Sequence, residues 1–366
     1  MKIILMITGL GIGGAETQVC SIADKLYNLG HNVTLIYLNG DKEVSPNNEN
    51  INVIGLNMKK TPLGLLKAYW QCRKILKKLN PDVLHSHMIH ANIFSRLLHI
   101  TVPIPMVIST AHSTNEGGKL RMLTYRFTNS LVNLSTNVSA EALQSFIAKK
   151  AMRPNQSTVV YNGINTDKFV YNKDARENYR KQLKLGDDDF LFLAVGRLTE
   201  PKDYPNLLNA FSIIVKNNPQ AKLSIVGKGE LEHELKGMSE KLGLVKDLYF
   251  LGARRDVDKF MSACDCFVLP SKYEGFGLVV AEAMSCERVA IGTDCGGVKE
   301  VIGSEGFLVE PENHLALADA MQKVIDLNYE QRKLIGIKAR TRIINNYSLD
   351  ATVSKWLELY KDPKCV

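Results

Sequence analysis

The chain has 366 residues, of which 45% are hydrophobic and 23% charged, and this composition is typical of a globular, soluble protein with two domains. No apolar run reaches the roughly 18 residues of a membrane-spanning helix, and the N-terminal residues do not resemble a secretory signal peptide. Residues 1–170 hold 18 Lys and Arg against 9 Asp and Glu, whereas residues 171–366 hold 28 against 29, so the net charge of +8 lies in the first half. A basic half without a nucleic-acid motif favours a membrane surface or a phosphorylated substrate over nucleic acid as a partner.

Short apolar runs alternate with amphipathic stretches through the first half of the chain. A helix is predicted from Ala15 to Leu29, because Gly30 provides a C-terminal stop. This order of strand and helix predicts a parallel sheet with helices on both faces. The strands are expected at residues 2–8 (KIILMIT), 32–38 (NVTLIYL), 82–87 (DVLHSH) and 105–110 (PMVIST).

A second α/β unit is predicted after a polar connection that runs from about residue 157 to Asp189. We expect a helix at residues 206–217 and a closing amphipathic helix at residues 348–361. The strands of this unit are expected at residues 190–197, 221–229, 247–252, 266–271 and 288–292. The predicted organisation is a Rossmann-like domain at residues 1–168, a second at 169–345 and a C-terminal helix at 346–366.

The segment "TGLGIGGAE" (residues 8–16) joins the first strand to the first helix. Gly9, Gly11 and Gly14 have the G-x-G-x-x-G spacing of dinucleotide-binding loops, which place an anion against bare backbone and a helix N-terminus. An NAD site also needs an acidic residue at the end of the second strand, and Asn39 stands there. A loop that faces a phosphate or a sugar is therefore favoured, and an NAD-dependent oxidoreductase is the alternative.

Two cations follow the first strand of the second unit. Arg197 ends this strand, and Lys202 lies in the loop that precedes the next helix. A guanidinium offers a planar fork of donors and an ammonium a point charge, so the pair suits a diphosphate. Two solvated loop charges are the alternative. A glycine loop at residues 227–230 follows the next strand, where a simple turn is the alternative.

Two glutamates and two glycines follow a later strand, in "LPSKYEGFGLVVAEAM" (residues 269–284). A helix is predicted to begin near Gly277, so Glu274 lies in the loop before it and Glu282 about one and a half turns into it. Backbone N–H groups at a helix N-terminus favour a phosphate, and carboxylates accept hydrogen bonds from sugar hydroxyls. This combination predicts a sugar nucleotide as ligand.

With these motifs the chain resembles the family 4 glycosyltransferases, retaining enzymes of the GT-B fold. The resemblance implies two Rossmann-like parallel-sheet lobes that face a central cleft, with the C-terminal helix crossing back to the first lobe. It implies transfer of a hexose or N-acetylhexosamine from a nucleotide sugar, most commonly a UDP sugar, with a GDP sugar as the alternative. The motifs that carry the resemblance, in the family's order, are GGAE (13–16), STAH (109–112), YNGIN (161–165), GRLTEPKD (196–203) and EGFGLVVAE (274–282).

The resemblance also implies roles for individual residues. Arg197 and Lys202 would hold the diphosphate and balance the charge on the leaving nucleotide, and Glu274 would contact the donor sugar. Glu282 would bind the ribose, and His112 would lie near the transferred sugar. The implied catalytic set is therefore Glu274, Arg197, Lys202 and His112. The implied donor-binding set is Gly13, Gly14, Arg197, Lys202, Gly227, Arg254, Glu274, Gly275, Phe276, Gly277, Leu278 and Glu282.

No metal or other cofactor is expected, because two cations and a helix N-terminus would take the place of a divalent ion. The acidic run at residues 187–189 is interpreted as solvated loop charge. His85, His87 and His90 lack a nearby acid or cysteine that would complete a metal site, so packing is favoured for them. Seven scattered cysteines predict reduced thiols and a cytoplasmic location.

The first half also carries basic amphipathic segments. The predicted helix at residues 63–80 has an apolar face beside its lysines, and residues 115–127 combine cations with apolar side chains. They suggest peripheral binding to the inner face of an anionic membrane and a polyprenyl-diphosphate-linked acceptor, as in O-antigen, capsule or exopolysaccharide synthesis. A packed helix with a solvated face, a soluble acceptor and a non-catalytic carbohydrate-binding protein are the alternatives. The cations assigned to acceptor or membrane are Lys74, Lys77, Lys119, Arg121 and Arg126.

Overall fold

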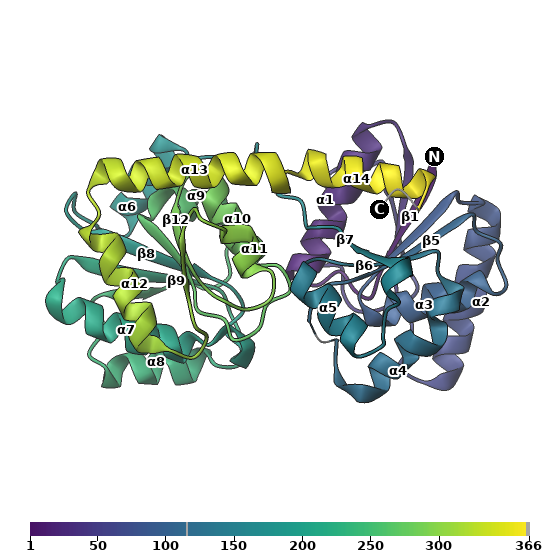
Figure 1. Cartoon of the computed structure of the whole chain (residues 1–366), viewed down its shortest axis with the longest axis horizontal. Helices are drawn as coiled ribbons and strands as arrows, with labels where there is room; N and C mark the ends of the chain where they lie inside the picture. The colour runs from purple at the N-terminus through teal and green to yellow at the C-terminus, as the bar shows by residue number, and fades with distance from the viewer. Residues whose placement is uncertain (115, 364–366) are drawn as a thin grey trace. The chain divides into compact units, whose positions relative to one another are not determined.

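The computed structural model describes residues 1–114 and 116–363. The chain divides into two compact units. Unit 1 comprises Met1–Gly163 and Leu349–Val366, and unit 2 comprises Ile164–Ser348. From the sequence, the domain boundaries were expected after residues 168 and 345. Both units are α/β structures, shown in Figure 1.

Unit 1 is built on a parallel sheet whose strand order, within the described residues, is β3-β2-β1-β4-β5-β6-β7. The predicted Rossmann-like sheet is confirmed, and the predicted strands lie within about one residue of the observed ones. The strands are β1 (Lys2–Ile7), β2 (Asn32–Tyr37), β3 (Asn52–Gly55), β4 (Val83–His87), β5 (Met106–Ala111), β6 (Leu134–Asn137) and β7 (Ser157–Val159).

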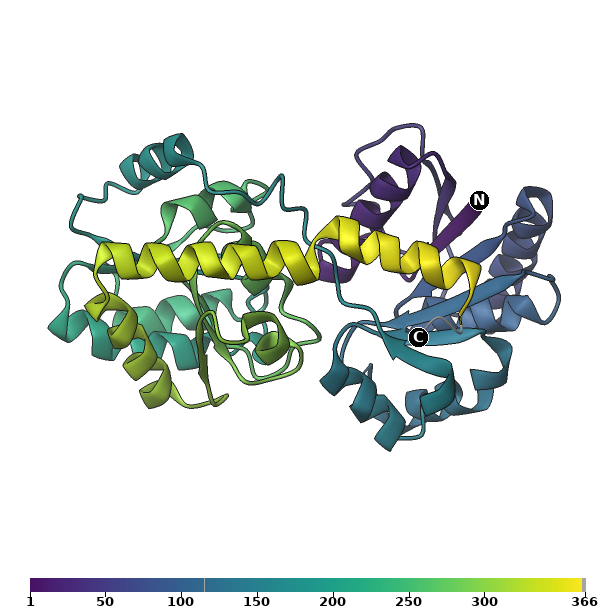
Figure 2. The ribbon, with the colours of Figure 1, turned by 45° about the horizontal axis from the view of Figure 1, so that its top comes forward.

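The period of two along a strand decides which helices cover each face of this sheet. Ile3, Leu5 and Ile7 of β1 pack into one apolar cluster, with α1 (Gly14–Asn28) and α14 (Leu349–Lys361). Ile4 and Met6 pack into another, with α2 (Pro62–Leu79) and α3 (Ile89–His99). Figure 2 shows α14 lying across the sheet of unit 1, beside α1.

A smaller apolar cluster lies under α4 (Gly118–Thr128) and α5 (Ala140–Ala148). Tyr125 of α4 and Phe146 of α5 are fully buried there and meet edge to face, with ring centroids 5.6 Å apart. This cluster anchors α4 to the body of unit 1. Two short 3-10 helices complete the unit, η1 (Asn129–Leu131) and η2 (Pro154–Gln156).

Unit 2 is built on a second parallel sheet, with the described strand order β10-β9-β8-β11-β12-β13. Each predicted strand of the second half is present. The strands are β8 (Phe190–Val195), β9 (Ala221–Val226), β10 (Leu248–Phe250), β11 (Cys266–Leu269), β12 (Val289–Thr293) and β13 (Phe307–Val309).

Helices cover both faces of the second sheet as well. Phe190, Phe192 and Ala194 of β8 pack into an apolar cluster with the helices α7 (Tyr204–Asn217), α8 (Glu232–Lys241) and α12 (His314–Asp326). The helix α9 (Val257–Ala263) contacts β8, and α10 (Leu278–Ser285) contacts β11 and β12. The helices of unit 2 are α6 (Lys173–Gln182), η3 (Glu200–Lys202), α7 (Tyr204–Asn217), α8 (Glu232–Lys241), α9 (Val257–Ala263), α10 (Leu278–Ser285), α11 (Val298–Ile302), α12 (His314–Asp326) and α13 (Tyr329–Tyr347).

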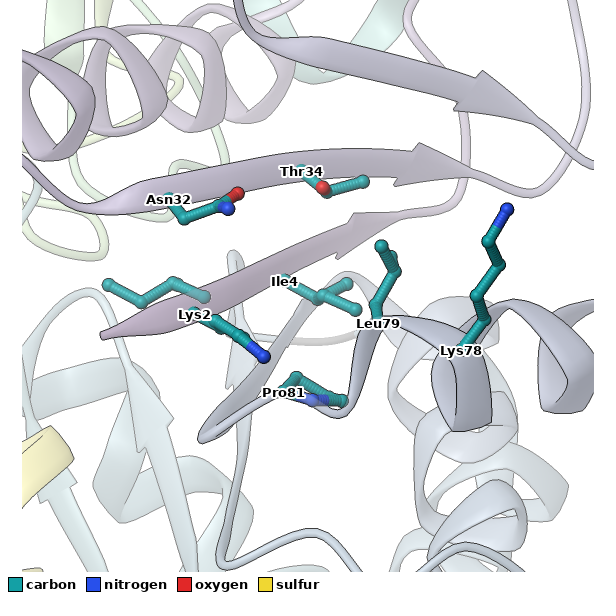
Figure 3. A pocket seen from close by; sticks show the side chains of 8 residues that line it. Lys2, Ile4, Asn32, Thr34, Lys78, Leu79 and Pro81 are labelled. Carbon is teal, nitrogen blue, oxygen red and sulfur yellow. The ribbon is translucent and has the colours of Figure 1, made fainter.

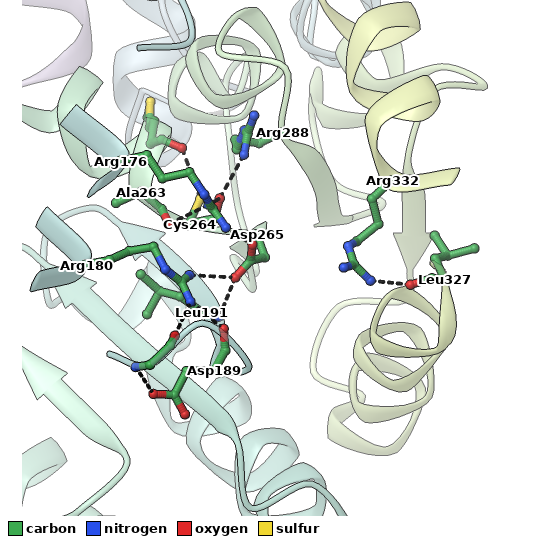
Figure 4. Close-up of polar contacts among 12 residues, drawn as sticks. Arg176, Arg180, Asp189, Leu191, Ala263, Cys264, Asp265, Arg288, Leu327 and Arg332 are labelled. Atoms are coloured by element: carbon green, nitrogen blue, oxygen red, sulfur yellow. Dashed lines mark hydrogen bonds and ion pairs between the residues drawn. The ribbon is translucent and has the colours of Figure 1, made fainter. Parts of the chain in front are cut away.

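The helix α6 corrects one prediction, because the segment up to Asp189 was expected to be a polar connection. Only one residue of α6 is buried, so its sequence lacks the apolar stripe that predicts a packed helix. Ion pairs hold it instead: Arg176 and Arg180 both contact the carboxylate of Asp265, at 2.6 and 3.1 Å (Figure 4). Asp265 also accepts a hydrogen bond from the backbone of Leu191 in β8, which ties α6 to the sheet.

The strand order of each sheet reverses direction at one place, between β1 and β4 in unit 1 and between β8 and β11 in unit 2. Open parallel sheets bind ligands beyond the carboxyl ends of the strands at such a switch point. The loops that follow β1, β4 and β5, and those that follow β8 and β11, are therefore the places to look for a site.

Candidate active site

The two predicted phosphate-binding cations lie in the loop between β8 and α7. Arg197 comes two residues after the end of β8, and its exposed side chain makes no hydrogen bond or ion pair with the described residues. Lys202 ends the short helix η3 and is half-buried. Arg197 is therefore free to meet a ligand, whereas Lys202 is already engaged within the protein.

Lys202 and Glu274 form an ion pair in unit 2. The same carboxylate oxygen accepts a hydrogen bond of 2.9 Å from the hydroxyl of Ser271. The two loops are also joined through the backbone, because the N–H of Lys272 donates to the carbonyl of Pro201 at 2.9 Å. The structure thus brings together the predicted diphosphate cation and the predicted sugar-binding carboxylate in one fixed cluster.

Glycine allows a third loop, between β12 and α11, to pack against Glu274. Gly296 has a φ of +56°, and a Cβ atom there would lie 1.9 Å from the carbonyl oxygen of Glu274. The N–H of Gly297 donates to the carbonyl of Gly275 at 3.2 Å. The backbone that carries Glu274 is therefore held from two sides, by the Lys202 loop and by Gly296–Gly297.

The helix α10 begins directly after the Glu274 loop. Gly277 precedes the helix with a φ of +86°, a conformation that favours glycine, and offers no side chain to cap it. Phe276 is buried and packs edge to face on Tyr347 of α13, at 5.6 Å between ring centroids. Gly275, Phe276, Gly277 and Leu278 therefore form a supported turn that leads into a helix N-terminus, where partial positive charge favours an anion.

The predicted loop around Gly227 lies beside the Arg197 loop. A Cβ atom at Gly227 would lie 1.8 Å from the carbonyl oxygen of Gly196, so only glycine permits this approach. The N–H of Gly196 donates to Val226, and the N–H of Gly227 donates to Gly252 at 2.9 Å. The loops after β8, β9 and β10 therefore pack closely at the carboxyl edge of the sheet.

Arg254 belongs to the donor-binding set that the resemblance implies. Its guanidinium forms a two-point contact with the carboxylate of Asp256, at 3.0 and 2.7 Å, and lies over the ring of Phe260. The hydrogen bond from Arg254 lowers the pKa of Asp256 to about 2. Asp256 also accepts a hydrogen bond from Tyr179 of α6. Arg254 is thus oriented by its own neighbours.

Glu282 lies on α10, five residues into the helix, as predicted. Burial raises the pKa of its carboxyl group to about 8, with Lys168 opposing and Asp258 adding to the shift. No hydrogen bond joins this carboxyl group to the described residues, so its preferred partner is a ligand hydroxyl or water.

The glycine loop of unit 1 has an acidic partner that the motif analysis missed. Gly13 precedes α1 in an extended conformation, with Gly14 as the first helical residue. Glu43 accepts a hydrogen bond of 3.1 Å from the N–H of Ile12. The carboxylate therefore comes from the segment after β2 and binds the loop itself, at a position later than the one an NAD site uses for the ribose.

His112 directly follows β5, at the carboxyl edge of the sheet of unit 1. Its backbone N–H donates to Glu116 at 3.0 Å, and Glu116 accepts a second hydrogen bond of 2.6 Å from the hydroxyl of Tyr125. The imidazole Nε2 lies 3.0 Å from Nδ1 of His87. Burial lowers the pKa of His112 to about 4, so its ring is neutral near pH 7.

The three histidines considered for a metal do not share a site. His85 is hydrogen-bonded to Tyr360 and to Thr110, and His90 is exposed on α3. Among the described residues, no group of three or more His, Cys, Asp or Glu side chains is arranged to hold a metal ion. The prediction of metal independence stays a prediction.

The cations assigned to acceptor or membrane lie on two helices of unit 1. Lys74 and Lys77 are exposed on α2, and Lys119 and Arg126 are exposed on α4. The guanidinium of Arg121 donates to the carbonyl of Glu116 at 3.0 Å and thus stays close to the loop after β5. No helix of the described chain is long and apolar enough to cross a membrane.

A hollow of about 250 Å³ lies at the other edge of the unit 1 sheet (Figure 3). It is lined by Lys2 and Asn32, the first residues of β1 and β2, and by Lys78 and Leu79 at the end of α2. This is the amino edge of the sheet, opposite the edge where parallel sheets hold ligands. We assign no function to it.

Several residues that build the site escaped the sequence analysis. Ser271 and Gly296 position Glu274, and Ser271 lies in the segment 269–284 that carries the glutamates. Glu116 binds the backbone N–H of His112, and Tyr125 holds Glu116. Each is recognised only through its spatial partner, and the sequence spacing alone gives no signal for such a pair.

Comparison with known proteins agrees with this geometry. Residues 12–168 match the family model described as "Glycosyltransferase Family 4", and residues 175–342 match "Glycosyl transferases group 1". A UDP-Gal:alpha-D-GlcNAc-diphosphoundecaprenol alpha-1,3-galactosyltransferase of Escherichia coli is 28% identical, over 81% of this chain and 79% of that protein.

Two further proteins extend the comparison. An N-acetylgalactosamine-N,N'-diacetylbacillosaminyl-diphospho-undecaprenol 4-alpha-N-acetylgalactosaminyltransferase of Campylobacter jejuni is 26% identical, over 93% of this chain and 94% of that protein. The crystal structure of Anabaena HepE with UDP and glucose superposes with a TM-score of 0.88 at 21% identity, over 99% of this chain and all of that one. The chain therefore belongs to the glycosyltransferases of the GT-B fold, with a family 4 first half and a group 1 second half.

Proposed function

We propose that this protein is a retaining, metal-independent glycosyltransferase that moves a hexose or N-acetylhexosamine from a UDP sugar to a polyprenyl-diphosphate-linked saccharide. The observation that carries this proposal is the cluster in unit 2 of Lys202, Glu274 and the turn before α10, with the free cation Arg197 two residues beyond β8. Two of the relatives act on diphospho-undecaprenol-linked saccharides according to their names, and one of them uses UDP-galactose.

The reaction needs negative charge to be stabilised on the leaving diphosphate. Arg197, Lys202 and the N-terminus of α10 supply positive charge for it without a metal ion. Glu274 would accept hydrogen bonds from sugar hydroxyls, and Glu282 from the ribose. In a front-face substitution the departing phosphate oxygen takes the proton of the acceptor hydroxyl, so the protein acts mainly by positioning and by charge stabilisation.

The ion pair between Lys202 and Glu274 gives this proposal a specific consequence. Donor binding has to redirect the ammonium toward a phosphate and the carboxylate toward the sugar. Before and after donor binding, the ammonium of Lys202 and the carboxylate of Glu274 each have a partner of opposite charge or a hydroxyl nearby. This limits the desolvation cost of exchanging one partner for another. Gly13, Gly14 and His112 of unit 1 stay predicted substrate contacts.

The donor is tested with a panel of nucleotide sugars and thermal unfolding of the purified chain. A donor at 100 times its Kd stabilises the folded state by about 2.7 kcal/mol, so the correct sugar nucleotide raises Tm. Arg197→Ala loses this shift, whereas Lys216→Ala keeps it, because Lys216 is an exposed lysine of the same unit at the far end of α7. A GDP sugar as the only stabilising ligand would replace the UDP assignment, and stabilisation by NAD alone would contradict the proposal.

We further propose that unit 1 binds the inner face of the cytoplasmic membrane. Leu120 and Phe127 on α4 are 77% and 76% exposed, beside Lys119 and Arg126. Exposed apolar side chains flanked by cations favour an anionic bilayer surface. Arg126 also lines a hollow of about 520 Å³ together with Lys150 and Arg153.

Membrane binding is tested by flotation with vesicles that contain or lack phosphatidylglycerol. Binding only to the anionic vesicles, weakened by salt, supports the proposal, since each Lys or Arg near such a surface contributes about 1 kcal/mol. The pair Leu120→Ser with Phe127→Ser is expected to lower binding, and Val245→Ser is the matched control because Val245 is an exposed apolar residue of unit 2. Equal recovery with neutral vesicles would contradict recognition of an anionic surface. No recovery with either kind of vesicle would contradict membrane association and favour a soluble acceptor.

A further inference from the structure

Buried aromatic and imidazole rings lie in a row along one face of β4 in unit 1. His85 and His87 lie on the same face of this strand, and their ring centroids are 4.1 Å apart. The ring centroid of Trp356 in α14 lies 4.3 Å from that of His85. His85 and His87 are both almost completely buried. The mechanism proposed above uses neither of them, although His87 touches His112.

The two histidines differ in how their nitrogens are satisfied. In His85, Nδ1 pairs with the hydroxyl of Tyr360 at 2.8 Å and Nε2 pairs with the hydroxyl of Thr110 at 2.7 Å. In His87, Nδ1 pairs with Nε2 of His112 at 3.0 Å, and Nε2 is buried without a partner among the described residues. His87 therefore directs its single hydrogen bond at His112.

Both members of the His87–His112 pair are neutral near pH 7. Burial lowers the pKa of His112 to about 4 and the pKa of His87 well below its usual value. A neutral imidazole carries one N–H, so one ring of the pair donates and the other accepts. The choice of donor fixes the tautomer of both rings.

The orphaned nitrogen of His87 decides which ring donates. If His112 were the donor, the proton of His87 would sit on Nε2, as a buried N–H without an acceptor in the described part of the chain. If His87 is the donor, its Nε2 is an unpaired acceptor instead. Unpaired buried N–H groups are the rarer of the two in proteins, so the second arrangement is favoured.

We propose that His87 is a positioning residue that donates its Nδ1–H to Nε2 of His112 and thereby holds His112 in the Nδ1–H tautomer, with this N–H directed at substrate. Nδ1 of His112 makes no hydrogen bond with the described residues and is not among their buried unpaired atoms, so it is open to a ligand. The group it meets is then a hydrogen-bond acceptor, such as a sugar or phosphate oxygen. This role for Nδ1 rests on the proposed function.

Hydrogen bonds hold the backbone N–H of His112 in place. Glu116 binds the backbone N–H of His112, and Asn92 donates at 2.8 Å to the hydroxyl of Tyr125, which in turn donates to Glu116. Arg96 is fully buried, and its guanidinium donates at 3.1 Å to the carbonyl of Tyr125. With its backbone fixed, His112 has only its ring orientation and tautomer to set, and His87 sets both.

The test is the tautomer of His112, read from the nitrogen-15 chemical shifts of its ring in the full-length protein labelled at histidine. The wild type is expected to show a protonated Nδ1 and a bare Nε2 for His112 at pH 7. In His87→Leu, which removes the donor, His112 is expected to move toward the Nε2–H form that free histidine side chains prefer. His87→Asn places an amide N–H near the position of Nδ1 and is expected to restore the wild-type pattern.

This readout does not depend on finding the substrate. His99→Asn is the control variant, because His99 bonds the carbonyl of Leu131 and has no contact with His112. An Nε2–H tautomer of His112 in the wild type, or a tautomer unchanged in His87→Leu, would overturn the inference whatever reaction the protein catalyses. If the labelled protein shows the expected tautomer but no nucleotide sugar is turned over, the proposed function fails and the positioning stands.

Where turnover is measurable, the same variants give a second reading. His87→Leu is expected to lower kcat by about 10- to 100-fold, by analogy with the loss found when the outer partner of a metal-ligating histidine is removed. His87→Asn is expected to recover most of this loss, and KM for the donor should change less than kcat. Equal kcat for His87→Leu and the wild type, with the tautomer shifted, would show that Nδ1–H is not used in the reaction and would overturn that part of the inference.

Discussion

The carboxyl edges of the two sheets are built in different ways. In unit 2 the edge carries full charges, with Arg197 exposed and Lys202 paired with Glu274. In unit 1 the edge carries neutral rings, since burial keeps His87 and His112 uncharged. The negative charge of a leaving diphosphate is stabilised by cations, whereas a substrate hydroxyl is oriented by directed hydrogen bonds. The two sheets thus offer similar edges, and the residues of the loops decide the chemistry of each edge.

The charged edge gives the largest expected effect. Arg197→Ala, Lys202→Ala and Glu274→Ala are each expected to lower turnover by about 100- to 1,000-fold, the cost of losing one group that stabilises developing charge. The measurement is nucleotide release with the identified donor, alongside circular dichroism to confirm that the fold is retained. Near-normal turnover in all three variants would contradict the assignment of the site.

The backbone that supports this edge gives the next effect. Gly296→Ala places a Cβ atom 1.9 Å from the carbonyl of Glu274 at a φ of +56°, so the loop has to shift. We expect turnover to fall about tenfold or more, because a displacement of about 1 Å in a positioned group can cost up to 100-fold. Gly243→Ala is the matched control, since Gly243 also has a positive φ, +72°, but nothing within 4 Å of an added Cβ.

The control separates two costs. Gly243→Ala measures the strain of a positive φ, which is of order 1 kcal/mol, and it should leave turnover unchanged. Urea unfolding gives the loss of stability for both variants. If Gly296→Ala lowers stability and turnover no more than Gly243→Ala does, close contact between the loops is not what holds Glu274.

The comparison of the edges also shows where sequence reasoning stops. Strands and helices with an apolar period, such as β1 and α1, follow from the pattern because burial dictates it. The helix α6 does not follow from the pattern, because it is held by ion pairs of Arg176 and Arg180 with Asp265, a residue distant in the sequence. The motif around Glu274 indicates chemistry because the residue types themselves carry it, but the tie between Glu274 and Ser271 depends on loop geometry.

The neutral edge predicts sensitivity to acid. A histidine whose pKa is lower in the folded state than in the unfolded state adds stability above pH 6.5 and loses it as the pH falls through the folded value. Burial lowers the pKa of His85 to about 3 and that of His112 to about 4. We therefore expect the free energy of unfolding to fall steadily between about pH 6.5 and pH 3. His85→Gln should have a shallower fall; a fall as steep as in the wild type would place the acid sensitivity elsewhere.

The half-buried carboxyl group of Glu282 in unit 2 predicts the opposite dependence on pH and the smallest effect. The pKa of Glu282 is raised to about 8 by burial, so its ionised form destabilises the fold as the pH rises from 4.5 to 8. Glu282→Gln is expected to match the wild type in urea unfolding at pH 4.5 and to be the more stable of the two at pH 8. One pKa unit corresponds to about 1.4 kcal/mol, so a gain of one to a few kcal/mol is expected.

The same variant separates stability from binding at this edge. If Glu282 holds the ribose, Glu282→Gln stabilises the free protein at pH 8 but weakens its response to the donor, because a neutral amide is a poorer acceptor than a carboxylate. The two measurements then move in opposite directions, which a purely structural glutamate does not produce. If Glu282→Gln is less stable than the wild type at pH 8, the carboxylate of Glu282 has a hydrogen-bond partner within the protein, as the side chains at the edge of unit 1 do. Unchanged donor response would remove Glu282 from the binding set and leave the charged edge to Arg197, Lys202 and Glu274.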